Sequence, residues 1–313
     1  MRNPVFILWL LVVATGTFLA ARLIGNAYVF FAGYVVLQYI VLATGWNILG
    51  GYTGYVNFGI SAFFALGAYS TVVLHKLVPG LPLPLMIAVG GLVSGVIGMG
   101  TGYLTLRLRG TFFSIATLAM AVVAQTLITN WSFVGGSRGA YIVRPAHAPL
   151  LGIDYIQYLF LVMLILSVIA VASARAIEQS RLGYGFATIR DDELAAEASG
   201  VPTLRLKLIA TALSGGFMGM AGAPLPYYVT YLDTASGFSL SYAVNTIAMP
   251  LIGGTSSWLG PVIGAVLLGT LQQVATVTIS SALSLLIVGL MLVGFVIAAP
   301  QGIIGLFKPR ARR

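Results

Sequence analysis

The chain has 313 residues, of which 59% are hydrophobic and only 7% are charged, whereas a soluble domain carries about 25% charged residues. The net charge is +9, but the 16 Lys and Arg are too sparse and scattered to form a nucleic-acid-binding surface. This composition excludes a soluble enzyme, a disordered chain and a nucleic-acid-binding domain, and predicts an all-α polytopic membrane protein. Since the chain has no Cys, it can form neither disulfides nor Cys-ligated metal sites.

Stretches without charge bound the expected membrane spans, because a spanning helix needs about 20 apolar residues. Two spans fit between residues 22 and 75, and three fit between 233 and 308. The stretches that fit one span each are 2–22, 76–107, 109–138, 154–175 and 207–233. We therefore expect a single transmembrane domain, 1–313, with about ten spans and at least eight. Residues 1–21 also fit the pattern of a signal peptide, although they are long enough to span.

The basic residues predict the orientation, since cytoplasmic loops of membrane proteins collect Lys and Arg. An even number of spans puts both termini on one side. With both termini in the cytoplasm, twelve basic residues lie inside and four outside, whereas the opposite orientation inverts this ratio. The inside group is Arg2, Arg107, Arg109, Arg175, Arg181, Arg190, Arg205, Lys207, Lys308, Arg310, Arg312 and Arg313; the outside group is Arg22, Lys76, Arg138 and Arg144. We predict that both termini are cytoplasmic.

One cytoplasmic segment, 178–204, stands out by its charge. Ten of the 23 charged residues lie between 175 and 207. Thr188 and Asp191 fit a capping box, Gly200 suits the left-handed position that ends a helix, and Pro202 prevents its continuation. We predict one helix of about eleven residues, which either is a solvated loop helix or contacts a cytoplasmic protein. The residues expected at such a contact are Arg190, Asp191, Asp192, Glu193, Ala195, Ala196, Glu197, Ala198 and Gly200.

Polar residues in otherwise apolar stretches are candidates for a translocation pathway. The stretch 50–59 is too rich in Gly for a continuous helix, and 253–257 is a second interruption. Paired interruptions are typical of a translocation site, but plain turns between helices explain them equally well. Asn57 and Ser61, four residues apart on one helical face, are the preferred pair. The other candidates are Thr53, Gln125 and Asn245, then Asn47, Thr246, Gln272 and Gln273, and each could instead form an interhelical hydrogen bond.

Several kinds of chemistry lack residues to support them. No acidic residue lies inside an expected span, which argues against an ion-coupled carrier and favours an external energy source. His75 and His147 are isolated, so no metal site is expected. No Gly-x-Ser-x-Gly motif and no His within a span support catalysis. A stand-alone secondary carrier or channel remains the main alternative to an energised transporter, and an intramembrane enzyme is the least favoured.

Several motifs, collinear from about residue 45 to 302, resemble those of the branched-chain amino acid (LivM-type) permeases of ABC importers. Glu197, Ala198 and Gly200 are similar to the EAA-type coupling motif of such permeases. The resembling stretches are 54–69, 106–118, 135–139, 189–201 and 252–264. The chain departs from the family at Asn57, where Ser is frequent, and at Ile60, where His is frequent, and this leaves the exact substrate open.

The resemblance implies a non-catalytic permease subunit in a bacterial or archaeal inner membrane. Its expected partners are a second, related permease, two ATP-binding subunits and a periplasmic or extracellular solute-binding protein. The expected cargo is a branched-chain amino acid or a related small polar solute. Because the chain has no Gly-x-x-x-x-Gly-Lys-Ser/Thr loop, we expect it to bind no cofactor itself. ATP with Mg would be hydrolysed by the partner subunits.

Overall fold

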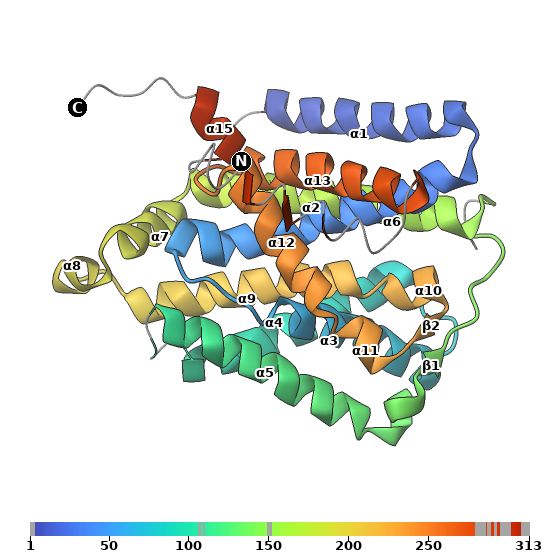
Figure 1. Cartoon of the computed structure of the whole chain (residues 1–313), viewed down its shortest axis with the longest axis horizontal. Helices are drawn as coiled ribbons and strands as arrows, with labels where there is room; N and C mark the ends of the chain where they lie inside the picture. Colours follow the sequence, from blue (N-terminus) through green and yellow to red (C-terminus); the bar gives the residue numbers. More distant parts are fainter. Residues whose placement is uncertain are drawn as a thin grey trace.

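The computed structural model describes residues 4–105, 108, 110–148, 152–278, 286, 289–290, 293–294 and 302–307. In this part of the chain the long helices lie side by side in a bundle (Figure 1). Eight candidate spans are long and apolar enough to cross a membrane. The long helices are α1 (Pro4–Ile24), α2 (Ala27–Thr53), α3 (Ile60–Leu77), α4 (Leu83–Thr105), α5 (Thr111–Thr129), α6 (Tyr155–Glu178), α9 (Thr203–Gly222) and α13 (Leu259–Thr278). The prediction of an all-α polytopic membrane protein is confirmed.

Shorter elements lie at the two ends of the bundle and within it. At one end, α7 (Arg181–Asp191) and α8 (Glu193–Ala198) protrude from the bundle, at the left in Figure 1. At the other end, β1 (Ala140–Tyr141) pairs antiparallel with β2 (Tyr231–Leu232), with Ala140 opposite Leu232. The remaining short elements are η1 (Ser132–Val134), η2 (Gly136–Arg138), α10 (Leu225–Val229), α11 (Thr234–Gly237), α12 (Leu240–Gly253) and α15 (Gly302–Phe307).

Of the ten expected spans, eight correspond to the candidate spans of the structure, one to the short helix α12, and one to a stretch that lies mostly outside the described residues. Helix α12 occupies the first of the three spans expected between 233 and 308, but its 14 residues cover only about 21 Å. Helix α13 is the second, and the third falls on 279–301, most of which lies outside the described residues. Both α15 and the start of α1 lie toward the end that carries α7 and α8 (Figure 1). This arrangement fits an even number of crossings.

The predicted cytoplasmic side is only partly covered by the described residues. Arg2, Arg107, Arg109, Lys308, Arg310, Arg312 and Arg313 lie outside them. Helix α1 is attached to the bundle near α7 and α8, where the Arg175 guanidinium lies 3.6 Å from the centre of the Phe6 ring. The signal-peptide alternative for 1–21 and the cytoplasmic location of the termini both stay predictions.

Glycines allow α4 and α9 to pack with their backbones in close contact. A Cβ atom at Gly95 would lie 3.1 Å from the Ala212 carbonyl oxygen, and one at Gly98 would lie 3.2 Å from that of Thr211. A Cβ at Gly219 of α9 would overlap the Ser94 side chain of α4. In lipid, where helices gain little from hydrophobic association, such small residues supply van der Waals contact. The glycines of α4 and α9 therefore serve close packing within the bundle.

Both predicted helix interruptions exist, but the first is shorter than expected. Helix α2 continues through Gly50 and Gly51 and ends only at Thr53, so the break covers 54–59 rather than 50–59. Gly54 adopts the left-handed conformation, with φ of 78°, that ends the helix. The second break, 254–258, separates α12 from α13. Glycine content overestimated the first break because the helical glycines serve close packing: a Cβ at Gly51 would crowd the Thr255 carbonyl oxygen at 2.7 Å.

The glycine packing predicts opposite effects for two substitutions in the same helix. A Cβ at Gly222 would overlap the Phe64 carbonyl oxygen, whereas the nearest atom to a Cβ at Gly216 is 3.5 Å away. We expect Gly222→Ala to destabilise the purified protein by about 1–3 kcal/mol through overpacking. Gly216→Ala should be neutral or stabilising by up to about 1 kcal/mol, since Ala favours the helix. Thermal unfolding in detergent measures both, and equal midpoints for the two variants would contradict the backbone contact.

Candidate functional site

The charged segment forms two helices rather than the one predicted. Helix α7 begins after Ser180, whose hydroxyl accepts hydrogen bonds from the amides of Leu182 and Gly183. Helix α8 begins after Asp192, whose carboxylate accepts from the amides of Leu194 (2.9 Å) and Ala195 (3.1 Å). The prediction that Thr188 caps a helix is wrong, because Thr188 lies inside α7 and its hydroxyl donates to the Gly185 carbonyl. Asp192 itself is extended and caps α8, which interrupts what would otherwise be one helix.

The predicted end of the segment is confirmed. Gly200 has φ of +82°, the left-handed conformation that glycine adopts most easily. The Val201 amide donates to the Ala196 carbonyl and the Gly200 amide to the Glu197 carbonyl, both at 3.0 Å. Such bonds satisfy the last carbonyls of α8, and Pro202 then precedes α9.

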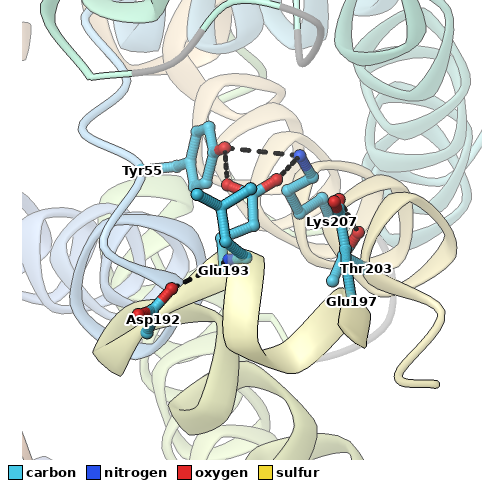
Figure 2. A network of polar contacts seen from close by, with 7 residues as sticks. Tyr55, Asp192, Glu193, Glu197, Thr203 and Lys207 are labelled. Atoms are coloured by element: carbon cyan, nitrogen blue, oxygen red, sulfur yellow. Dashed lines mark hydrogen bonds and ion pairs between the residues drawn. The ribbon is translucent and has the colours of Figure 1, made fainter. Parts of the chain in front are cut away.

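The most buried charges of this region join α8 to the bundle (Figure 2). The Lys207 ammonium donates to the Glu193 carboxylate at 2.7 Å, and the exposed fractions of the two side chains are 4% and 13%. The Tyr55 hydroxyl donates to the other Glu193 oxygen. Lys207 also donates to the Tyr55 oxygen at 3.3 Å and lies 4.9 Å from the centre of its ring. Glu193, Lys207 and Tyr55, which we call the buried triad, therefore connect α8, α9 and the 54–59 connection.

A second acidic residue of α8 also points to α9. The Thr203 hydroxyl donates to Glu197 at 2.8 Å (Figure 2). Ala196 is the buried residue of α8, whereas Leu194, Ala195 and Ala198 are exposed. The leucine keeps 62% of its surface exposed. Helix α8 thus directs Glu193 into the bundle and bonds the exposed Glu197 to α9, while it presents small and apolar side chains outward.

Helix α7 is anchored separately. The Arg190 guanidinium donates to the Gly51 carbonyl of α2 at 3.4 Å and lies 3.5 Å from the Asp191 carboxylate. At the end of α6, Glu178 accepts hydrogen bonds from the Tyr52 hydroxyl (3.3 Å) and from the Trp258 amide (2.8 Å). These contacts fasten the charged segment to α2 and to the connection between α12 and α13.

The preferred pathway pair does not share a helical face. Asn57 precedes α3, and its side-chain oxygen accepts a hydrogen bond from the Gly59 amide at 2.7 Å. Ser61 lies in the first turn of α3. The expectation that both belong to one helix is therefore wrong, because the glycine-rich break extends to Gly59. Both side chains are buried. The Thr53 hydroxyl donates to the Leu49 carbonyl of its own helix at 2.7 Å.

The other pathway candidates are distributed along the bundle. The Asn245 amide group of α12 donates to the Tyr39 hydroxyl of α2 at 3.0 Å. The Gln125 amide group of α5 reaches the Thr234 carbonyl at 3.4 Å, near the end with the β-strands. Gln273 accepts from the Tyr28 hydroxyl. Asn57 and Ser61 thus lie close together at the start of α3, whereas Gln125 lies beside Thr234, toward the end with the β-strands.

A small cavity of about 50 Å³ lies between α3, α4, α5 and α9, beside Asn57. Its lining includes the threonines Thr101, Thr105, Thr117 and Thr211. This volume holds a few water molecules at most and is too small for an amino acid. Among the described residues, no group of three His, Asp or Glu could hold a metal ion.

Sequence reasoning missed three of the residues that build this site. Lys207 was counted only among the cytoplasmic basic residues, Tyr55 was not selected as a site residue, and Thr203 was given no role. One signal could have found two of them: Glu193 and Glu197 are four residues apart, and so are Thr203 and Lys207. Because residues four apart share a helical face, two such pairs on consecutive helices can meet across a short turn. Nothing in the sequence points to Tyr55, which comes from a distant connection.

The fold is that of a multi-pass α-helical membrane protein, with α7 and α8 protruding at one end (Figure 1). The family described as branched-chain amino acid transport system, permease component, matches residues 27–296, and the chain belongs to this family. It is 26% identical to the high-affinity branched-chain amino acid transport permease LivM of Salmonella typhimurium, over 99% of this chain and 77% of that protein.

Other relatives include both kinds of permease of these systems. LivM of Escherichia coli is also 26% identical, over 89% of this chain and 70% of its own length. The probable permease LivH of Methanocaldococcus jannaschii is 22% identical, over 88% of this chain and 90% of its own length. No solved structure matches the chain. The chain is therefore a permease component of an ABC importer, and its relatives are transport subunits rather than enzymes.

The cap of α8 gives a test of its local structure. We expect Asp192→Ala to lose the two hydrogen bonds to the Leu194 and Ala195 amides and to destabilise α8 by about 1 kcal/mol. Asp192→Asn should keep most of the stability, because the Asn side chain also accepts these bonds. Hydrogen exchange of the amides of α8 in the purified protein measures the difference. Equal exchange in the Ala and Asn variants would show that another group starts the helix.

Proposed function

We propose that this permease imports branched-chain amino acids or related small polar solutes, and that α7 and α8 receive an ATP-hydrolysing subunit in the cytoplasm. The observation that carries the proposal is the construction of α8. Glu193 is bonded inward to Lys207 and Tyr55, and the exposed Glu197 is bonded to Thr203 of α9. Beside them, Leu194, Ala195 and Ala198 are exposed. Small side chains on a capped helix allow a partner surface to approach its backbone closely.

The proposed assembly has further members. A second, related permease would complete the transport pathway, which fits the existence of two kinds of relative, LivM and LivH. Two ATPase subunits would supply energy through ATP and Mg, and a solute-binding protein would deliver cargo at the end with β1 and β2. The membrane would be the inner membrane of a bacterium or archaeon, with α7 and α8 on the cytoplasmic side.

The choice of solute rests on the family and the relatives' names rather than on a formed binding site. The proposed pathway residues are Asn57, Ser61, Thr53, Gln125 and Asn245. The cavity beside Asn57, about 50 Å³, would have to widen to pass a solute. We therefore propose that this conformation is closed to the solute and that widening follows from movement at the α7–α8 end.

Co-purification tests the assembly directly. The tagged chain, extracted gently from native membranes, should bring with it a second permease and two ATPase chains in stoichiometric amounts. ATP hydrolysis by this complex should rise when the solute-binding protein is loaded with a branched-chain amino acid. A folded chain that transports in liposomes without any ATPase would contradict the proposal.

The contact surface predicts a specific effect of added bulk. Because Ala195 is exposed, we expect Ala195→Arg to leave the fold intact and to block the approach of the ATPase. Recovery of the ATPase chains with the tagged permease should fall at least about tenfold, the size expected when a well-packed contact loses about 1.4 kcal/mol or more. Ala146→Arg, at an exposed position of the opposite end, is the matched control and should co-purify normally. Unchanged recovery with Ala195→Arg would place the ATPase elsewhere.

A further inference from the structure

Helix α8 is attached to the bundle mainly by polar contacts. It buries one side chain of its six residues, that of Ala196. Glu193 and Glu197 bond to Lys207 and Thr203 of α9, so residues four apart on α8 meet residues four apart on α9. Glu193 and Lys207 form an ion pair that water hardly reaches, so separating the two charges is costly. A displacement of α8 therefore carries the first turns of α9 with it.

The buried triad extends this attachment to a third element, the 54–59 connection. Tyr55 donates to Glu193, and its ring packs edge-on against Phe113 of α5, with the ring centres 5.1 Å apart. Figure 2 shows the Tyr55 hydroxyl pointing at both the Glu193 carboxylate and the Lys207 ammonium. The triad thus brings the connection between α2 and α3 into contact with α8.

The 54–59 connection is in turn bonded to the start of α5. The Ser114 hydroxyl donates to the Val56 carbonyl at 2.8 Å. The Phe58 amide donates to the Thr117 hydroxyl oxygen at 3.0 Å. Together with the contact between Tyr55 and Phe113, these bonds hold the connection at three points along the first two turns of α5.

Helix α5 is otherwise held loosely. Four of its 19 residues are buried: Phe113, Thr117, Ala121 and Ile128. The first two of these lie at the end that binds the connection. A helix that is fixed mainly at its first turns follows a displacement of those turns. The side of α5 that faces α3, α4 and α9 also lines the cavity beside Asn57.

We propose that Glu193, Lys207 and Tyr55 are positioning residues that transmit the movement of α8 to α9 and, through the 54–59 connection, to α5. The inference rests on the proposed function, since it takes α8 as the element that the ATPase moves. The triad touches neither ATPase nor solute in this assignment. It determines how much of the ATPase movement reaches the wall of the cavity beside Asn57.

The first test separates assembly from coupling in the complete importer, reconstituted in lipid. Glu193→Gln and Tyr55→Phe should co-purify with the ATPase subunits as the wild type does. Solute uptake per ATP hydrolysed should fall about tenfold, within the range of coupling energies between linked sites. The double variant Glu193→Lys, Lys207→Glu keeps one charge of each sign and should recover part of the loss. Tyr103→Phe makes the same chemical change as Tyr55→Phe at an exposed position of α4 and serves as the control.

The second test follows α5 itself, which the absence of Cys from the chain makes practicable. Spin labels attached at Leu92→Cys in α4 and Val123→Cys in α5, both exposed positions, report the distance between the two helices. In the complex with cysteine-free partners, this distance should change between the nucleotide-free and ATP-bound states. In the Tyr55→Phe background, the change should be lost or strongly reduced.

The outcomes distinguish this inference from the proposed function. If the ATPases bind and drive uptake but the labels show the same nucleotide-dependent change in Tyr55→Phe, transmission through the triad is wrong and the coupling surface stands. A wild-type complex in which α5 does not move also overturns the inference. If the wild-type permease transports without ATPases, both fail. Should Glu193→Gln not fold, Tyr55→Phe, which removes a single hydroxyl, decides.

Discussion

The ion pair between Glu193 and Lys207 is the buried charged contact that joins α8 to the membrane-spanning bundle. With 4% of the lysine and 13% of the glutamate side chain exposed, each charge depends on the other and on Tyr55 for the bonds that water would otherwise supply. Removal of one partner of such a pair costs about 3–5 kcal/mol, because the remaining charge stays buried. The pair is therefore weak support for stability in itself but strong support for a fixed geometry between α8 and α9.

That geometry matters because the bundle has both tightly and loosely packed parts. Helices α3, α4 and α9 meet through glycines, and any Cβ at Gly67 or Gly222 would overlap backbone atoms of a neighbouring helix. Such contacts leave little room for sliding. Helix α5 buries four of its 19 residues and is bonded at its start to the 54–59 connection. A transporter needs one part that moves against another that does not, and this division meets that need.

The sequence was most informative where lipid imposes a simple rule. Charges avoid hydrocarbon, so the uncharged stretches predicted the long helices and the limits of segment 178–204, which the structure bounds at Glu178 and Thr203. The left-handed conformation of Gly200 at the end of the helix was also predicted from the sequence. Helix α7 was missed because Gly183 and Gly185 lower helix propensity. In the structure, these glycines bring α7 close to the Ile177 carbonyl and to Leu206.

The helix start at Thr188 was wrong for a related reason. A capping pattern is a local signal, and the segment contains several residues that can cap. Phe186 and Ile189 are both buried, so packing continues α7 past Thr188, and Asp192 then accepts the amide bonds of α8. The triad was beyond local reasoning altogether, since Tyr55 lies far from Glu193 and Lys207 in the chain and only the fold brings them together.

The pathway residues also could not be identified from local sequence alone. Sequence reasoning selected them by polarity, yet the side chains of Asn57, Thr53 and Asn245 each bond to groups of this chain. Thr246, another candidate, and the buried hydroxyls of Thr44 and Ser214 have no hydrogen-bond partner within the described residues. A buried polar group without a partner costs about 1–3 kcal/mol, so water, a solute or movement of a neighbouring helix would be favoured where it supplies the missing bond. What distinguishes a pathway group from a structural one is therefore whether its bonds are already satisfied, and a sequence read one residue at a time does not contain that information.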